Sequence, residues 1–160
     1  MRIQLEENFN NKEYENFIVK DTKNTFYHSS KHIKFLEDIL NAKAFAITAK
    51  ENSQLIGILP FFLKESKYGK VVNSFPFFGS YGGVISNDSE AMRKILESLN
   101  NFNEENDVLS SVIVSNPFNR NEEIYNKFYN FNAKEDRLIQ CTILENKSQE
   151  IIWNNLEQRV

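Results

Sequence analysis

Residues 44–66, AFAITAKENSQLIGILPFFLKES, contain two apolar runs that are separated by a polar tetrapeptide. The runs are rich in Phe, Ile and Leu, and residues 51–54 (ENSQ) have the polar composition of a turn. The stretch therefore predicts a β-hairpin. Pro60 lies inside the second predicted strand, and because proline cannot donate a backbone hydrogen bond, we expect it at a sheet edge or at a bulge.

Further strands are predicted on both sides of this hairpin from alternating or continuous apolar residues. They are residues 1–5, short strands within 71–86, a buried strand at 108–115, and 138–145.

Helices are predicted where apolar residues recur at helical spacing behind a capping residue. They are residues 13–20, a helix that begins after Ser29 or Ser30, one from Asp88 or Ser89 to about Asn101, residues 121–129, and 148–159 with Ser148 as the N-cap. Helices thus alternate with strands around one hairpin, which predicts an α/β (α+β) sandwich with a mixed sheet.

Composition places the chain among globular proteins. Its 160 residues are 41% hydrophobic, which is enough for one domain with its own core. The net charge of −3 gives no broad basic surface for nucleic acid. The single cysteine, Cys141, excludes an internal disulfide framework. Together with the lack of a signal sequence and of a long apolar run, this predicts a cytoplasmic location.

Three segments resemble the N-terminal domain of FemA/FemB-like N-acyltransferases, which have a GNAT-type fold. They are TFYHSSKHIKFL (25–36), LIGILPFFLKESKYGKVVNSFPFFGSYGG (55–83) and LIQCTILENKSQEIIWNNLEQRV (138–160). The resemblance implies a GNAT-like domain over residues 1–147. It also implies that residues 148–160 begin a helix leading to a second GNAT-like domain.

The family transfers an acyl or aminoacyl group to an amine of bacterial peptidoglycan or surface-polysaccharide precursors. The resemblance therefore implies acyl-CoA or aminoacyl-tRNA as the co-substrate of a complete enzyme, with tRNA as a possible partner. It also implies that this domain helps to form the acceptor pocket. We expect these residues alone to bind no cofactor and to be inactive.

The resemblance points to six acceptor-site residues: His28, Ser29, Lys34, Tyr81, Gly82 and Gly83. The two glycines permit close approach of a ligand, and Lys34 is placed to pair with a phosphate. Each has an ordinary structural alternative. The glycines and neighbouring Phe residues suit a bulged strand with a filled core, and Lys34 suits a solvated helix surface.

The remaining motifs give weaker evidence of a binding or catalytic site. Residues 54–59 (QLIGIL) nearly match a pyrophosphate-binding loop, but they lie in a predicted strand, whose N–H groups pair with a neighbouring strand instead of facing a helix N-terminus. His28 and His32 are four residues apart and would share a face of a helix. Two histidines alone are too few ligands for a zinc site. Cys141 fits a buried apolar position, and Arg159 fits a helix C-terminus.

The first functional hypothesis is therefore the acceptor-binding part of a two-domain N-acyltransferase, with no assigned catalytic residue. A stand-alone binding module with the same fold is the alternative, and a complete single-domain GNAT enzyme is a third. The two-domain hypothesis predicts an exposed apolar face near residues 75–81 and Trp153.

Overall fold

The protein is described here by a computed structural model, which covers residues 1–21, 23–76, 81–138 and 148–154. The strands are β1 (Arg2–Glu6), β2 (Lys43–Glu51), β3 (Gln54–Ser66), β4 (Gly69–Asn73), β5 (Ile85–Ser86) and β6 (Val108–Val112). The helices are α1 (Lys12–Ile18), the 3-10 helix η1 (Phe26–His28), α2 (Ser30–Leu40), α3 (Ser89–Glu105), α4 (Glu122–Phe128) and α5 (Gln149–Asn154).

The sheet is mixed, as the sequence predicts. Its strand order is β1-β2-β3-β4-β6, and β5 pairs with β3 beside this path. The β4–β6 pair is parallel, whereas the other pairs are antiparallel. The hairpin of β2 and β3 is confirmed, with Asn52 and Ser53 forming its two-residue turn at positive φ angles of 47° and 64°.

Pro60 lies in β3, a central strand, but at a point where one side of the strand is locally an edge, as the sequence predicts. It pairs with Ala46 of β2, and the irregularity in that ladder falls at Ala49 and Lys50 instead. On the other side of β3, β5 pairs with Gly57 and Ile58, whereas β4 begins its pairing at Phe62. Between these two strands, the side of β3 away from β2 has no ladder partner among the described residues, so a residue without an N–H donor is tolerated there.

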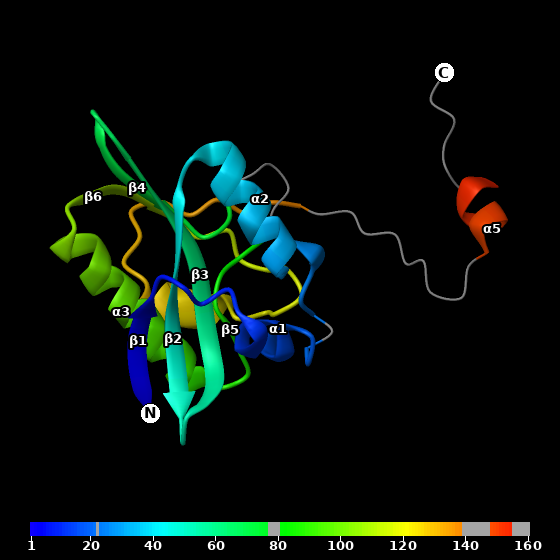
Figure 1. Ribbon diagram of the computed structural model, residues 1–160, viewed down its shortest axis with the longest axis horizontal. Helices are drawn as coiled ribbons and strands as arrows, with labels where there is room; N and C mark the ends of the chain where they lie inside the picture. The colour runs from blue at the N-terminus through cyan, green and yellow to red at the C-terminus, as the bar shows by residue number, and fades with distance from the viewer. Residues whose placement is uncertain (22, 77–80, 139–147, 155–160) are drawn as a thin grey trace.

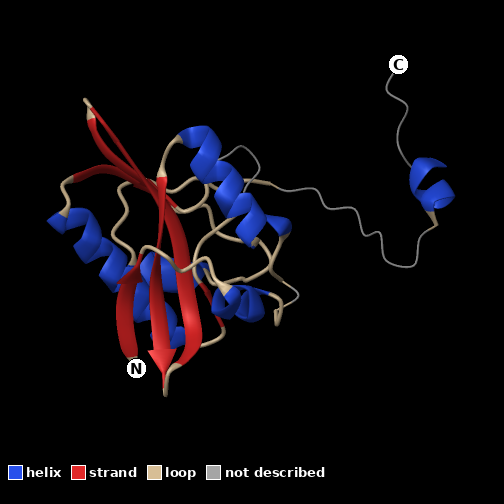
Figure 2. Ribbon diagram, in the orientation of Figure 1, coloured by secondary structure: helices blue, strands red, loops and turns tan. Residues whose placement is uncertain are grey.

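Helices cover both faces of the sheet (Figure 1). Helices α1 and α2 pack on one face through a cluster of buried side chains that includes Tyr14, Ile33, Leu36, Ile58 and Phe62. Helices α3 and α4 pack on the other face through a second cluster that includes Ile47, Leu59, Phe61, Ile95, Leu96 and Tyr125. Figure 2 shows the resulting helix–sheet–helix layers.

Strand β6 is half-exposed, although the sequence predicts a buried strand at 108–115. It pairs with β4 on one side and is the last strand of the described path. Leu109 is accordingly 70% exposed, and Val112 is 41% exposed. An apolar run predicts burial, but it does not report whether the strand lies inside the sheet or at its edge.

The C-terminal predictions are tested only in part. Ser148 accepts a hydrogen bond from the N–H of Ile151 at 3.2 Å, which confirms it as the cap of the last helix. The predicted helix residues 155–159, with Arg159, lie outside the described residues, as do Cys141 and all of the predicted strand 138–145 except Leu138. Among the described helices, none is long and apolar enough to span a membrane.

Candidate functional site

The site lies where the chain leaves β4 and later returns to the same neighbouring strand. The N–H of Ser74 donates to the carbonyl of Val112 at 3.0 Å, and Ser74 Oγ accepts from the N–H of Val114 at 3.0 Å. The chain returns at Gly82, whose N–H donates to the carbonyl of Val114 at 2.7 Å. Gly82 also forms a parallel bridge with Ser115. Both ends of the excursion are therefore bonded to one continuous segment, the end of β6 and the three residues that follow it.

Phe75 links this excursion to the start of α2. Its buried ring meets the His28 ring edge-on, with centroids 5.6 Å apart, and lies 6.3 Å from that of His32. A Cβ on Gly82 would stand 2.5 Å from Phe75 Cδ2, so only glycine fits beside that ring. Two residues predicted to line the site, His28 and Gly82, are thus brought together around Phe75.

His28 is fully buried at the end of η1. Its Nδ1 accepts the N–H of Thr25 at 3.1 Å, and its carbonyl accepts the Tyr14 hydroxyl at 2.5 Å. Nε2 has no hydrogen-bond partner among the described residues. Burial lowers the pKa of His28 to about 4, although the nearby backbone of Thr25 and Gly82 offsets part of the effect. The imidazole is therefore neutral at pH 7.

An aromatic surface surrounds the second histidine, His32. We define it as Phe26, Tyr27, Phe35 and Tyr81. The ring of His32 lies 5.4 Å from Phe26, 5.3 Å from Tyr27 and 6.1 Å from Phe35. Tyr81 joins through Tyr27 at 5.8 Å. Phe26 is 67% and Phe35 49% exposed, whereas His32 is only 6% exposed.

This arrangement makes His32 a better binding candidate than His28, which the sequence favours. The sequence contains one local signal of the aromatic surface. His32 and Phe35 are three residues apart, so they share a face of α2. Nothing local predicts that Tyr27 and Tyr81 meet, since they come from distant segments. Tyr81 itself is half-buried, as a residue lining a binding surface should be.

Ser29 and Lys34 have other roles in the fold. Ser29 is the N-cap of α2, and its Oγ accepts the N–H of His32 at 3.3 Å. Lys34 lies two residues beyond His32, on a different face of α2. Its exposed ammonium pairs with Asp38 at 3.0 Å, and that hydrogen bond raises the pKa of Lys34. The structure therefore does not bring Lys34 to the aromatic surface.

Gly83 is approached by a protein side chain. It has a φ of 84°, and a Cβ there would lie 2.5 Å from the hydroxyl oxygen of Tyr125. That hydroxyl accepts the N–H of Val84 at 2.7 Å. The space beside both glycines, which the sequence assigned to a ligand, is thus filled by Phe75 and Tyr125.

The first turn of α3 is capped by the carboxylate of Asp88. Asp88 Oδ1 accepts the N–H of Ala91 at 2.8 Å, and Ser86 Oγ accepts the N–H of Asp88 at 3.0 Å. Glu90 follows in the same turn and pairs with Arg93. Residues 54–59, the near match to a pyrophosphate loop, lie in β3 as predicted and pair with β2.

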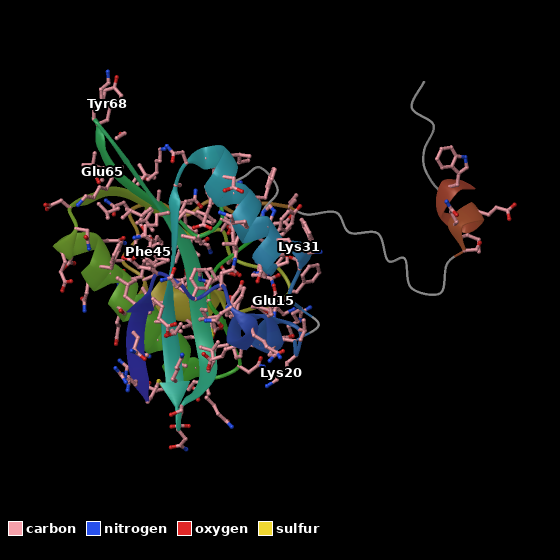
Figure 3. The ribbon with its side chains drawn as sticks, in the orientation of Figure 1. Glu15, Lys20, Lys31, Phe45, Glu65 and Tyr68 are labelled. Carbon is pink, nitrogen blue, oxygen red and sulfur yellow. The ribbon has the colours of Figure 1, made fainter. Side chains whose placement is uncertain are left out.

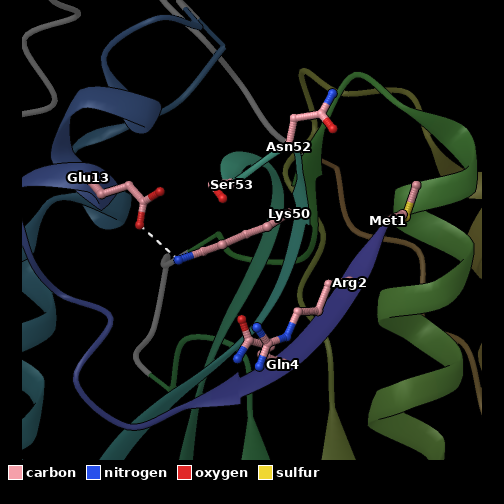
Figure 4. A pocket seen from close by; sticks show the side chains of 7 residues that line it. All are labelled: Met1, Arg2, Gln4, Glu13, Lys50, Asn52 and Ser53. Carbon is pink, nitrogen blue, oxygen red and sulfur yellow. Dashed lines mark hydrogen bonds and ion pairs between the residues drawn. The ribbon is translucent and has the colours of Figure 1, made fainter.

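Two shallow hollows open elsewhere on the described surface. One of about 540 Å³ lies beside the turn of β2 and β3 (Figure 4). Its central Lys50 is already paired with Glu13 at 2.9 Å and with Glu6 at 3.3 Å. The other, of about 270 Å³, borders the start of α3, and its lining includes Lys23, Arg120 and Glu123. No group of three metal-ligating side chains occurs among the described residues.

Comparison with known proteins identifies the fold. No family model matches the chain, and no curated protein matches its sequence. Among solved structures, a ribosomal-protein-alanine N-acetyltransferase from Brucella melitensis biovar Abortus 2308 is similar, with a TM-score of 0.57 and 12% identity. The match covers 88% of this chain and 100% of that one.

Two further solved structures have a similar fold. An aminoglycoside acetyltransferase from an uncultured soil metagenomic sample, in complex with trehalose, has a TM-score of 0.57 and 15% identity, covering 90% of this chain and 96% of that one. A predicted acetyltransferase with acetyl-CoA from Clostridium acetobutylicum has a TM-score of 0.50 and 14% identity, covering 92% and 100%. The fold is therefore that of GNAT-type acetyltransferases.

Proposed function

We propose that these residues form the acceptor-binding domain of a FemA/FemB-like N-acyltransferase. The enzyme would transfer an acyl or aminoacyl group to an amine of a cell-wall or surface-polysaccharide precursor. The sequence resemblance supports the family, and the GNAT-type fold is consistent with it. The division of labour between domains is supported by one observation, the closed first turn of α3.

The capped turn supports the proposal that the phosphates of an acyl-CoA bind in another part of the enzyme. A helix N-terminus binds phosphate through free N–H groups and a favourable dipole. Here the Asp88 carboxylate already occupies the N–H of Ala91, whereas Glu90 is paired with Arg93, and Lys23 and Arg120 line the hollow beside this turn. The donor, whether acyl-CoA or aminoacyl-tRNA, would then be held by a second GNAT-like domain.

The acceptor side is supported by the aromatic surface. Exposed Phe26 and Phe35, with Tyr27 and Tyr81, offer apolar faces on which a sugar ring can stack. His28 supports the surface from beneath through Phe75. In this proposal Gly82 and Gly83 act by admitting Phe75 and Tyr125, whereas Ser29 fixes the start of α2.

The chemistry would be attack of the acceptor amine on the activated acyl carbonyl. The domain would contribute by orienting the amine, and alignment of two reactants removes much of the entropic barrier of a bimolecular step. No covalent intermediate with the protein is required.

The test compares this chain with the whole product of its gene. The coding sequence downstream of Val160 is read, and both proteins are assayed with acetyl-CoA, aminoacyl-tRNA and amine acceptors. Acyl transfer by the whole product, with none by the 160-residue chain and no binding of coenzyme A to it, would support the proposal. Substantial turnover by the 160-residue chain would overturn it in favour of a complete single-domain enzyme.

The same closed turn is compatible with a second candidate, a stand-alone binding module that kept the fold without the reaction. This candidate predicts that the whole gene product binds an amine-bearing ligand and transfers no acyl group from either donor.

A further inference from the structure

Helix α5 has no packing partner among the described residues. The described part of α5 is six residues long, and its side chains Ile151 and Trp153 are 48% and 71% exposed. Neither belongs to a core cluster, and no described hydrogen bond joins α5 to another element. A helix shorter than about 12 residues is marginal in water unless it packs against other elements. We therefore expect α5 to lie against a protein surface.

The exposed side of α2 is an apolar stripe that continues the aromatic surface. Lys31, Phe35 and Ile39 follow one another at four-residue spacing, so they share one face of the helix. Phe35 and Ile39 are each about half exposed. Phe26, which is two-thirds exposed, joins Phe35 through the ring of His32. A contiguous exposed apolar face with a charge at its border is typical of an interaction site.

The chain between α4 and α5 is long enough to bring α5 to this side of α2. The residues before 139, orange in Figure 1, leave the layers on the side where α2 lies, opposite to β6. Nine residues separate Leu138 from Ser148, and a fully extended chain of that length spans about 30 Å. Helix α2, with 11 residues, is only about 16 Å long. A tether of this length also gives α5 a high effective concentration at α2.

The exposed apolar side chains on the opposite side of the molecule are poorer candidates. Tyr68 is 78% exposed at the tip of the β3–β4 hairpin, and Figure 3 shows it far from Lys31. Leu109 lies on β6, which is also on that side (Figure 1). The place where the chain leaves the layers therefore favours α2 as the docking surface.

We propose that α5 docks on the exposed side of α2. Trp153 packs against the rings of Phe26 and Phe35. Glu150 of α5 pairs with Lys31 of α2. Glu150 shares a face with Trp153, three residues on, as Lys31 shares a face with Phe35. Both charged side chains are exposed, and neither forms an ion pair among the described residues.

This inference does not rest on the proposed function, because it concerns a contact within the chain. An acceptor stacked on the same rings would exclude α5, so the two would compete for the aromatic surface.

Trp153 reports on the contact because it is the single tryptophan of the chain. Its fluorescence is compared between the 160-residue chain and a synthetic peptide of residues 148–154, in which the indole is exposed. In the chain, emission should lie at shorter wavelength and acrylamide should quench it at least about two-fold less, because the rings shield the indole. Neither value should change on dilution, since docking within one chain does not depend on concentration.

Phe26→Ala and Phe35→Ala should each release Trp153. Both replace exposed residues, so circular dichroism should show an unchanged fold, and each should lower the docking equilibrium constant about two- to ten-fold. Tyr68→Ala is the matched control, because it removes an exposed aromatic ring away from α2 and should leave the Trp153 signal unchanged. If a variant fails to fold, NMR of the unmodified chain decides the matter, since docking requires NOE contacts between Trp153 and the ring of Phe26 or Phe35.

A charge exchange tests the orientation of α5. Lys31→Glu places a carboxylate beside Glu150 and should weaken docking about two- to five-fold, with a smaller effect at high salt. Adding Glu150→Lys to that variant restores opposite charges and should restore the protection of Trp153. Lys34→Glu makes the same charge change on another face of α2 and should have less effect.

Three results would overturn the inference. The first is a Trp153 as accessible in the chain as in the peptide. The second is protection that survives both phenylalanine replacements, which would place α5 on another surface. The third is protection that falls on dilution, which would make the contact one between copies. Failure of the double charge variant to restore protection would overturn the pairing of Glu150 with Lys31. None of these results depends on acyl transfer, so the proposed function is tested separately.

Discussion

The hydroxyl of Tyr125 accepts the backbone N–H of Val84 at 2.7 Å in the interior of the protein. Burial raises the pKa of Tyr125, so the phenol remains protonated at neutral pH. Gly83 makes the contact possible because it has no Cβ to collide with the hydroxyl. This hydrogen bond ties α4 to the segment that leads into β5.

Tyr125→Phe should destabilise the protein by about 1–3 kcal/mol, because the buried N–H of Val84 loses its only described acceptor. Gly83→Ala should also destabilise it, through a positive φ and a Cβ placed 2.5 Å from the hydroxyl oxygen. Urea unfolding of both single variants and the double variant measures their coupling. Removing the hydroxyl relieves the collision, so the combined loss should be smaller than the sum. Strictly additive losses would show that the two residues do not interact.

His28 should make the protein sensitive to acid. The pKa of His28 is about 4 in the folded state, below its ordinary value of 6.5, so folding favours the neutral imidazole. The stabilisation is complete above pH 6.5 and is lost as the pH falls to about 4, by up to about 3 kcal/mol. The measurement is the free energy of unfolding between pH 7 and 4. His28→Asn keeps an acceptor for the N–H of Thr25 without titrating, and should flatten this dependence. An equally steep decline in that variant would assign the effect to other groups.

The Asp88 cap should contribute measurably to stability. Asp88→Ala removes the acceptor for the N–H of Ala91. It should lower the free energy of unfolding by about 1 kcal/mol, and the melting temperature with it. Asp88→Ser retains a capping oxygen and serves as the control. Its loss of stability should be only a few tenths of the loss in the alanine variant. Equal melting temperatures for the alanine variant and the parent protein would mean that this carboxylate does not hold the turn closed.

Ser74 should matter more to stability than an exposed serine on β6, the last strand of the described sheet. Ser74→Ala leaves the N–H of Val114 without its acceptor at 3.0 Å and should cost about 1–2 kcal/mol. Ser110→Ala, on exposed β6, is the comparison and should change stability by less than about 0.5 kcal/mol. Chemical denaturation of both variants decides the matter, and indistinguishable midpoints would contradict a structural role for Ser74 Oγ.

The local pattern was sufficient for most helices and strands. The β2–β3 hairpin follows from two apolar runs around a polar turn, and the predicted caps Ser29, Asp88 and Ser148 all accept helix N–H groups. Pro60 lies at a local edge inside a central strand, and the sequence could not place that edge because it depends on where β4 and β5 end along β3, which is a property of distant segments.

The site was less predictable than the fold. The meeting of His28 with the Gly82 segment agrees with the family resemblance, but Phe75 as the link between them has no local signature. The role of Tyr125 was missed for the same reason, since it lies 41 residues from Val84. The three-residue spacing of His32 and Phe35 does indicate part of the aromatic surface, because it places both residues on one face of α2.

Ser74 is bonded to Val112, the last residue of β6, and Gly82 is bonded to Val114, two residues further along the chain. The number of residues between these two anchor points is therefore uncoupled from the register of the sheet. Exchanges at Tyr81 would therefore alter what stands beside Tyr27, whereas exchanges at Phe75 would also disturb the buried cluster on which α1 and α2 pack.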